Sequence, residues 1–168
     1  IAANVTQVVV VVAAMPAFHE DLLLRCLVAC EQQDIKGLIV LNKSDLIDET
    51  VPTAGQLALY ESLGYTVVPL SAKQDVTPIL LPLHGHRSVV VGQSGMGKST
   101  IVNALVPDAK ARTAEFSTKL DAGKHTTTGA RLYHLDPDTS IIDSPGMQTF
   151  GLHHFSQLDL VNGFPEFR

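Results

Sequence analysis

A glycine-rich segment, Gly92–Ser99, follows directly after the apolar run Ser88–Val91. Glycine adopts left-handed backbone conformations at little cost, so the glycines of this segment allow the chain to turn sharply. An apolar run without alternation is typical of a strand that is covered on both faces, as in a parallel sheet. The residues after the segment have a helical pattern as far as Leu105. A strand, a tight turn and a helix in this order favour a doubly wound α/β fold.

The rest of the chain repeats this alternation of strand and helix patterns. We expect strands at Val8–Ala13, Gly37–Leu41, Tyr65–Leu70, Ser88–Val91, Ala130–Leu135 and Ser140–Ile142. We expect helices at Phe18–Gln32, Gly55–Leu63, Thr77–Leu83, Lys98–Leu105 and around Ser156–Val161. Asp136-Pro137-Asp138 predicts a turn, and the polar stretch Lys110–His125 predicts a long loop. The prediction is one α/β domain over residues 1–168, a doubly wound and mostly parallel sheet with a buried core.

Composition narrows the classes of function. The formal net charge of −5 argues against a nucleic-acid surface over the whole domain, although it leaves room for a local basic patch. The longest apolar run, Val8–Met15, is far shorter than the roughly 20 residues of a membrane-spanning helix. Cys26 and Cys30 lie four positions apart in a helical pattern, too few for a structural zinc site and poorly placed for a disulfide. We expect reduced, buried thiols and a cytoplasmic protein.

The glycine-rich segment matches the pattern GxxxxGKS/T in the strand-to-helix context that a phosphate-binding loop requires. Backbone amides around the glycines and the helix amino terminus attract phosphate oxygens. Lys98 is expected between the β- and γ-phosphates, where it also assists catalysis, and Ser99 is expected to ligate Mg²⁺. A glycine turn with an exposed lysine is the alternative. The predicted phosphate-binding residues are Gly92, Gln93, Ser94, Gly95, Met96, Gly97, Lys98, Ser99 and Thr100.

A second motif, Asn42-Lys43-Ser44-Asp45, follows the strand pattern Gly37–Leu41. Ligands of α/β sheets bind at the carboxyl ends of the strands. The Asp45 carboxylate can accept hydrogen bonds from N1–H and the N2 amino group of guanine, whereas adenine offers no such pair of donors. Such a site discriminates by about 10⁴-fold. Asn42 is expected to brace the phosphate loop, and the Lys43 stem is expected to cover the base.

Taken alone, that motif is equally consistent with a strand-end turn and an Asx cap. Ser71-Ala72-Lys73, at the end of the next strand pattern, favours the base site, because a guanine pocket uses such a segment from the neighbouring strand. By itself the tripeptide is a weak signal.

Metal and switch residues follow in the last third of the chain. In Asp143-Ser144-Pro145-Gly146, Asp143 is expected to hold Mg²⁺, through water, and the Gly146 amide to meet the γ-phosphate. A helix cap is the alternative role for Asp143. One hydroxyl of Thr126–Thr128 is expected to close over Mg²⁺ when the γ-phosphate is present, and we favour Thr127.

These motifs are those of translation-factor-like GTPases, but the base motif precedes the phosphate loop, whereas an ordinary GTPase begins with that loop. Circular permutation preserves a three-dimensional site when the new termini fall at an exposed connection. The order, together with GQSGMGKST, GKHTTT and DSPG, resembles the bacterial ribosome small-subunit-dependent GTPase A family (RsgA/YjeQ type). The opening AANVTQVVVV and the closing GFPEFR are similar to that family as well.

The resemblance implies a cytoplasmic, monomeric GTPase that binds GTP, GDP and Mg²⁺ and assists late maturation of the small ribosomal subunit. Family members carry an RNA-binding OB barrel before this domain and a zinc module after it. Neither pattern occurs in these 168 residues, so zinc is expected only in that other module. Contacts with rRNA and ribosomal proteins are expected to need the flanking domains, and no membrane partner is expected.

The residue that orients the attacking water differs from the glutamine of many small GTPases. Many small GTPases use a glutamine directly after the glycine of this last motif, but here that residue is Met147, which cannot polarise water. The resemblance implies His125 instead, because an imidazole of near-neutral pKa can position or deprotonate water. A solvated loop histidine is the alternative. The other histidines discussed, His84, His86, His153 and His154, are expected in surface or packing roles.

Three other functions stay open. The first is a permuted GTPase that acts on another ribosomal particle, the large subunit. The second is a P-loop kinase or ATPase in which Asn42–Asp45 is accidental. The third is a GTP-dependent binding module with negligible hydrolysis, which Met147 favours.

Overall fold

The computed structural model describes residues 4–106, 130–144, 151–152 and 155–164. Strands in these ranges form one six-stranded sheet in the order β3-β2-β1-β4-β6-β5. All neighbouring pairs are parallel except β5 and β6, which are antiparallel at one edge. The strands are β1 (Gln7–Ala13), β2 (Lys36–Asn42), β3 (Thr66–Pro69), β4 (Arg87–Val91), β5 (Arg131–His134) and β6 (Ser140–Asp143).

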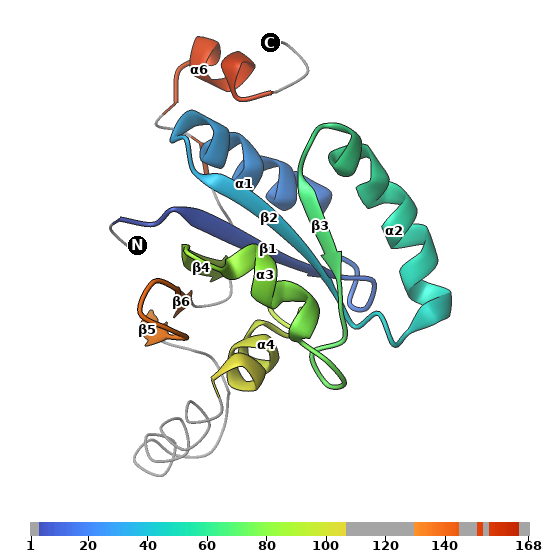
Figure 1. Cartoon of the computed structure of the whole chain (residues 1–168). Helices are drawn as coiled ribbons and strands as arrows, with labels where there is room; N and C mark the ends of the chain where they lie inside the picture. Colours follow the sequence, from blue (N-terminus) through green and yellow to red (C-terminus); the bar gives the residue numbers. More distant parts are fainter. Residues whose placement is uncertain (1–3, 107–129, 145–150, 153–154, 165–168) are drawn as a thin grey trace, which may run out of the picture.

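Helices cover both faces of the sheet (Figure 1). They are α1 (Glu20–Gln32), α2 (Ile47–Ser62), the 3₁₀ turn η1 (Thr77–Ile79), α3 (Leu80–Leu83), α4 (Lys98–Leu105) and α6 (Gln157–Asn162). Helices α1 and α2 pack on one face, η1, α3 and α4 pack on the other, and α6 lies against α1. The expected doubly wound, mostly parallel α/β fold is therefore confirmed. Across the described ranges, every helix is too short or too polar to cross a bilayer.

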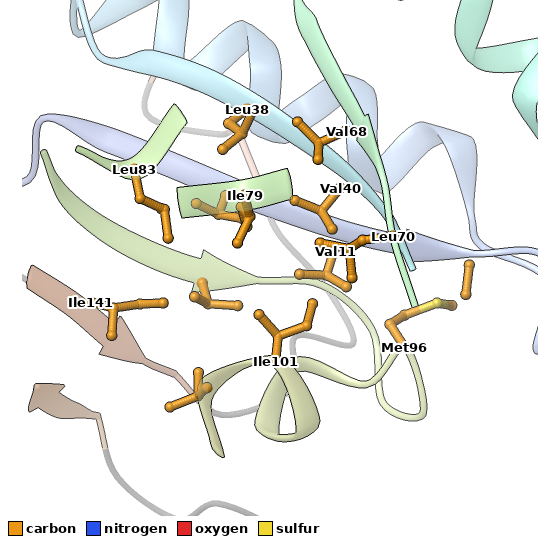
Figure 2. Close-up of a cluster of buried hydrophobic side chains, with 14 residues drawn as sticks. Val11, Leu38, Val40, Val68, Leu70, Ile79, Leu83, Met96, Ile101 and Ile141 are labelled. Atoms are coloured by element: carbon orange, nitrogen blue, oxygen red, sulfur yellow. The ribbon is translucent and has the colours of Figure 1, made fainter. Parts of the chain in front are cut away.

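The central strand β1 explains why its sequence is apolar without alternation. Successive side chains of a strand point to opposite faces. Val9 and Val11 enter the core beneath η1, α3 and α4, together with Ile79 and Ile101 (Figure 2). Val10 and Val12 enter the second core with residues of α1 and α2. Complete burial of such a side chain contributes about 1.5–3 kcal/mol, so both faces of β1 stabilise the fold.

Cys26 and Cys30 lie on the buried face of α1, as expected. Both thiols are free. Burial raises the pKa of each to about 12. The thiolate is the reactive form of cysteine, so these two side chains act as small apolar groups at neutral pH.

The start of α2 differs from the prediction. The sequence predicted a helix over Gly55–Leu63, but α2 begins at Ile47 and includes Pro52. The Thr50 amide donates to the Leu46 carbonyl at 2.9 Å, so the helical bonding starts well before the proline. Pro52 removes one intrahelical hydrogen bond, a loss that the burial of Leu57 and Tyr60 together offsets.

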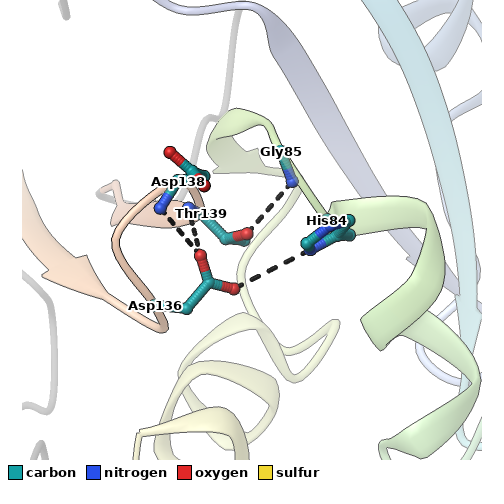
Figure 3. Close-up of polar contacts among 5 residues, drawn as sticks. All are labelled: His84, Gly85, Asp136, Asp138 and Thr139. Carbon is teal, nitrogen blue, oxygen red and sulfur yellow. Dashed lines mark hydrogen bonds and ion pairs between the residues drawn. The ribbon is translucent and has the colours of Figure 1, made fainter.

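The turn between β5 and β6 forms as predicted (Figure 3). Asp136 Oδ1 accepts hydrogen bonds from the amides of Asp138 at 2.8 Å and Thr139 at 2.7 Å. Hydrogen bonds from Thr139 and Asp138 lower the pKa of the Asp136 carboxyl. Thr139 Oγ1 in turn accepts from the Gly85 amide at 3.0 Å, which ties this turn to the connection between α3 and β4. His84 Nδ1 lies 3.9 Å from Asp136 Oδ2.

Candidate nucleotide-binding site

The strand order reverses between β1 and β4. The chain leaves β1 through α1 toward β2 on one side, and it leaves β4 through α4 toward β5 and β6 on the other. At such a switch point the two connections diverge, and the crevice between them is where α/β sheets bind ligands. The glycine-rich segment begins at this point, directly after β4.

Each glycine of this loop is required by its conformation. Gly92, Gly95 and Gly97 have φ values of +142°, +84° and +90°, which L residues with a side chain rarely adopt. A Cβ at Gly92 would collide with the Val11 carbonyl, and one at Gly97 would collide with the side-chain amide of Asn42. Helix α4 begins at Lys98, so its unpaired first amides and positive dipole end lie next to the loop.

Lys98 lies inside the loop rather than in solvent. Its side chain is 7% exposed, and Nζ donates a hydrogen bond to the Gln93 carbonyl at 2.8 Å. Burial lowers the pKa of the ammonium, while the carboxylate of Asp143 raises it. The alternative of an exposed lysine in a glycine turn is therefore wrong.

Asp143 ends β6 and pairs in register with Val90 of β4, one residue before the end of that strand. Burial raises the pKa of its carboxyl, and Lys98 and Arg131 lower it. Oδ1 is buried without a hydrogen-bond partner among the described residues. An unpaired buried carboxylate oxygen is costly, so a cation at this position would satisfy it. The environment of Asp143 is therefore compatible with the predicted role as a Mg²⁺ ligand.

Asn42 joins three segments that are far apart in the sequence. Its side chain is buried, and Nδ2 donates to the Met96 carbonyl of the glycine loop at 2.8 Å. Its Oδ1 accepts from the Ala72 amide at 3.0 Å. The end of β2, the segment Ser71–Lys73 and the glycine loop are thus held together by one side chain. This is the bracing contact that the sequence predicted.

Lys43 has a left-handed backbone, with φ of +64°. Its Nζ donates to the Gly95 carbonyl at 2.8 Å and to the Met15 carbonyl at 2.6 Å. The side chain therefore extends along the glycine loop. That its stem covers a base stays a prediction.

Asp45 is exposed and lies close to the segment after β3. The pKa of its carboxyl is lowered by the Ser71 hydroxyl, by its own backbone amide, and by the ammonium groups of Lys73 and Lys43. The Ser71 hydroxyl is buried and makes no hydrogen bond of regular geometry. The Ser44 amide donates to the Leu70 carbonyl at 3.1 Å, which fixes the two segments side by side. An ionised carboxylate therefore stands at the rim of the site.

Other predicted residues are exposed or lie beyond the described ranges. Ser94, Ser99 and Thr100 are exposed on the loop and the first turn of α4. His125, Thr126–Thr128, Gly146 and Met147 lie outside the described residues, as does the predicted loop Lys110–His125.

Sequence reasoning missed one segment that the structure brings to the loop, the turn Ala14–His19 after β1. The His19 amide donates to Gln93 Oε1 at 2.8 Å. A signal existed, because the segment after the strand next to β4 must reach the same edge of a parallel sheet.

A cavity of about 480 Å³ lies at the opposite end of the sheet, where the strands begin. Thr6, Lys36, Thr66 and His86 are among its lining residues. Neither the glycine loop nor the Asn42–Asp45 motif contributes to it, so it is separate from the candidate site.

The fold and the convergence of motifs define the class of this protein. A buried loop lysine at the switch point and an asparagine-anchored second motif at the same edge are features of a P-loop nucleotide-binding fold. The second motif precedes the loop in the sequence, so the chain has the circularly permuted arrangement of that fold.

Comparison with known proteins identifies the family. The family model described as RsgA GTPase matches residues 1–153. The chain therefore belongs to the RsgA GTPase family.

The curated relatives are proteins named small ribosomal subunit biogenesis GTPase RsgA. The Nitrosospira multiformis protein is 58% identical over 100% of this chain and 54% of its own length. The Nitrosomonas europaea protein is 53% identical with the same coverage of both chains. The chain thus spans about half the length of the curated relatives that it matches.

Two solved structures share the fold. The crystal structure of YjeQ from Thermotoga maritima is 29% identical with a TM-score of 0.76, over 98% of this chain and 56% of that one. The crystal structure of YloQ, described as a circularly permuted GTPase, is 30% identical with a TM-score of 0.72, over 98% of this chain and 52% of that one.

Proposed function

We propose that residues 1–168 form a circularly permuted GTPase domain that binds GTP and GDP with Mg²⁺ and hydrolyses the β–γ phosphoanhydride of GTP. The observation that carries this proposal is the pair of hydrogen bonds that Asn42 makes, one donated to the Met96 carbonyl and one accepted from the Ala72 amide. They bring the base motif, its supporting segment and the phosphate loop to one edge of the sheet. An accidental Asn42–Asp45 match in a kinase or ATPase would not require that convergence.

Each described residue has a distinct task in this proposal. Lys98 neutralises charge on the β- and γ-phosphates, and the loop amides bind phosphate oxygens. Asp45 accepts from N1–H and N2 of guanine, for which its lowered pKa keeps it ionised at neutral pH. Ser99 and Asp143 hold Mg²⁺, which when bound neutralises charge that develops on phosphate oxygens.

Three residues outside the described ranges keep their predicted tasks as part of the proposal. Thr127 completes the metal site, the Gly146 amide meets the γ-phosphate, and His125 positions the attacking water.

Base identity is tested by Asp45→Asn. Two hydrogen bonds to a charged acceptor contribute about 1.5–3 kcal/mol each, so GTP affinity is expected to fall on the order of 10²-fold or more. The new amide donates to the C2 carbonyl of xanthine, so XTP affinity is expected to rise. Titration calorimetry of both nucleotides measures the change. The matched control is Asp48→Asn, an exposed carboxylate three positions further along. Equal wild-type affinity for ATP and GTP would rule out the base assignment.

The relatives' name is the basis for proposing a factor in biogenesis of the small ribosomal subunit. That the factor is cytoplasmic and monomeric and acts late in maturation is carried over from the sequence expectations. Its partners are rRNA and proteins of that subunit. Because contacts with the subunit are expected to need the flanking domains, we expect purified small subunits to raise the GTP turnover of a protein that carries them roughly tenfold or more, which corresponds to about 1.4 kcal/mol of barrier.

Purified large subunits are the control in that turnover assay. Stimulation by large subunits alone would favour the other ribosomal particle. Tight GTP binding without stimulated turnover would instead favour a GTP-dependent binding module.

A further inference from the structure

The turn Ala14–His19, between β1 and α1, lies next to the glycine loop, as one direct hydrogen bond, one lysine bridge and one close approach show. The His19 amide donates to Gln93 Oε1 at 2.8 Å. Lys43 Nζ bridges the two segments, because it donates to Met15 of the turn and to Gly95 of the loop. Pro16 Cγ lies 3.3 Å from the position that a Cβ on Gly95 would occupy. The segment that leads into α1 therefore lies along one side of the glycine loop.

Gln93 makes two hydrogen bonds at this place, one through its backbone and one through its side chain. Its backbone carbonyl accepts from Lys98 Nζ at 2.8 Å, and its side-chain oxygen accepts from His19. His19 is the N-cap residue of α1, with φ of −90° and ψ of 110°, so its amide lies before the helical bonding begins. The pattern GxxxxGKS/T leaves position 93 free. Nothing in the motif therefore assigns a task to this side chain.

We propose that Gln93 is a positioning residue whose side chain fastens the phosphate-binding loop to the amino terminus of α1 and thereby slows nucleotide release. This inference rests on the proposed function. A glycine-rich loop has more conformational freedom to lose on binding than any other kind of segment. A loop that is already fixed in its bound shape loses less, and preorganisation of this kind mainly lowers the dissociation rate.

The geometry permits a clean test, because the two contacts of Gln93 use different atoms. Gln93→Met removes the acceptor at similar side-chain length and keeps the backbone carbonyl that binds Lys98. His19→Pro removes the donor from the other partner, at a φ near the range that proline allows. His19→Ala keeps the donor and separates its contribution from that of the imidazole.

Release of a fluorescent GDP analogue from the 168-residue chain is the measurement. Gln93→Met and His19→Pro are each expected to accelerate release about 3- to 10-fold, the effect of losing one hydrogen bond. The double variant is expected to release no faster than either single variant, since both remove the same bond. His19→Ala is expected to release GDP more slowly than His19→Pro. In GTP turnover the effect is expected in KM more than in kcat.

Gln33→Met, the same change at the exposed carboxyl end of α1, is the matched control, with melting temperature measured for every variant. Wild-type release rates in Gln93→Met, or additive effects in the double variant, would overturn the inference. A lower melting temperature with unchanged release would also overturn it, because it indicates a purely structural contact. If the wild-type chain fails to bind GDP, it is the proposed function that fails.

Discussion

At the scale of single residues, the site depends on side chains that make two contacts at once. Asn42 is the clearest case, because a side-chain amide carries both a donor and an acceptor. A carboxylate of the same shape has no donor for Met96, and an aliphatic side chain offers neither group. The buried position of Asn42 raises the importance of the bond to Met96 above all, since that bond is shielded from water.

Replacement of Asn42 by alanine is expected to destabilise the nucleotide-free chain. The buried Met96 carbonyl and the partly buried Ala72 amide would lose their partner, at a cost of about 1–3 kcal/mol for the buried group and less for the other. Urea unfolding measures the change, and GDP affinity is expected to fall in parallel. Asn103→Ala in α4 is the control, expected to stay within about 0.5 kcal/mol of wild type. An unchanged urea midpoint for Asn42→Ala would show that the bridge contributes little.

At the scale of helices and strands, local signals predicted most elements well. Helix α4 has the bounds Lys98–Leu105 that the sequence predicted. A glycine with a left-handed backbone comes directly before the helix, and one face of the helix is apolar, so both signals are local. The predicted start of α2 was wrong because Pro52 and Gly55 have a low helix propensity. Propensity is a weak prior, and the packing of buried side chains such as Leu57 and Tyr60 against the sheet and α1 outweighs it.

The parts of the candidate site that directly follow strands could be predicted from the sequence. The register of β6 and the contribution of the turn after β1 could not. Carboxyl ends of parallel strands share one edge, so Asn42, Ser71 and the glycine loop were expected to meet. The register that sets Asp143 beside Val90 was not predictable, because hydrophobic periodicity does not encode which strands are neighbours. The turn Ala14–His19 was missed because it contributes backbone atoms, which no side-chain pattern marks.

At the scale of the whole molecule, the site is independent of the order in which its parts occur along the chain. Each part lies at the end of a strand, and the central strands β1 and β4 are packed on both faces. The last described helix returns to the first, since α6 lies against α1 (Figure 1). Gln32 Nε2 donates to the Asp159 carbonyl across this contact.

Replacement of glycine by alanine is expected to have opposite effects at Gly163, which lies in the contact of α6 with α1, and at Gly55, which lies in the open on α2. Gly163 has an ordinary φ of −76°, but a Cβ there would lie 2.7 Å from Val28 Cγ1, so Gly163→Ala is expected to destabilise by about 1–3 kcal/mol. Gly55 lies within α2 with no atom within 4 Å of a Cβ, so Gly55→Ala is expected to stabilise by about 0.5–1 kcal/mol. Urea unfolding measures both, and GDP affinity should stay constant because neither glycine touches the site. A neutral Gly163→Ala would mean that α6 is not docked on α1 in solution.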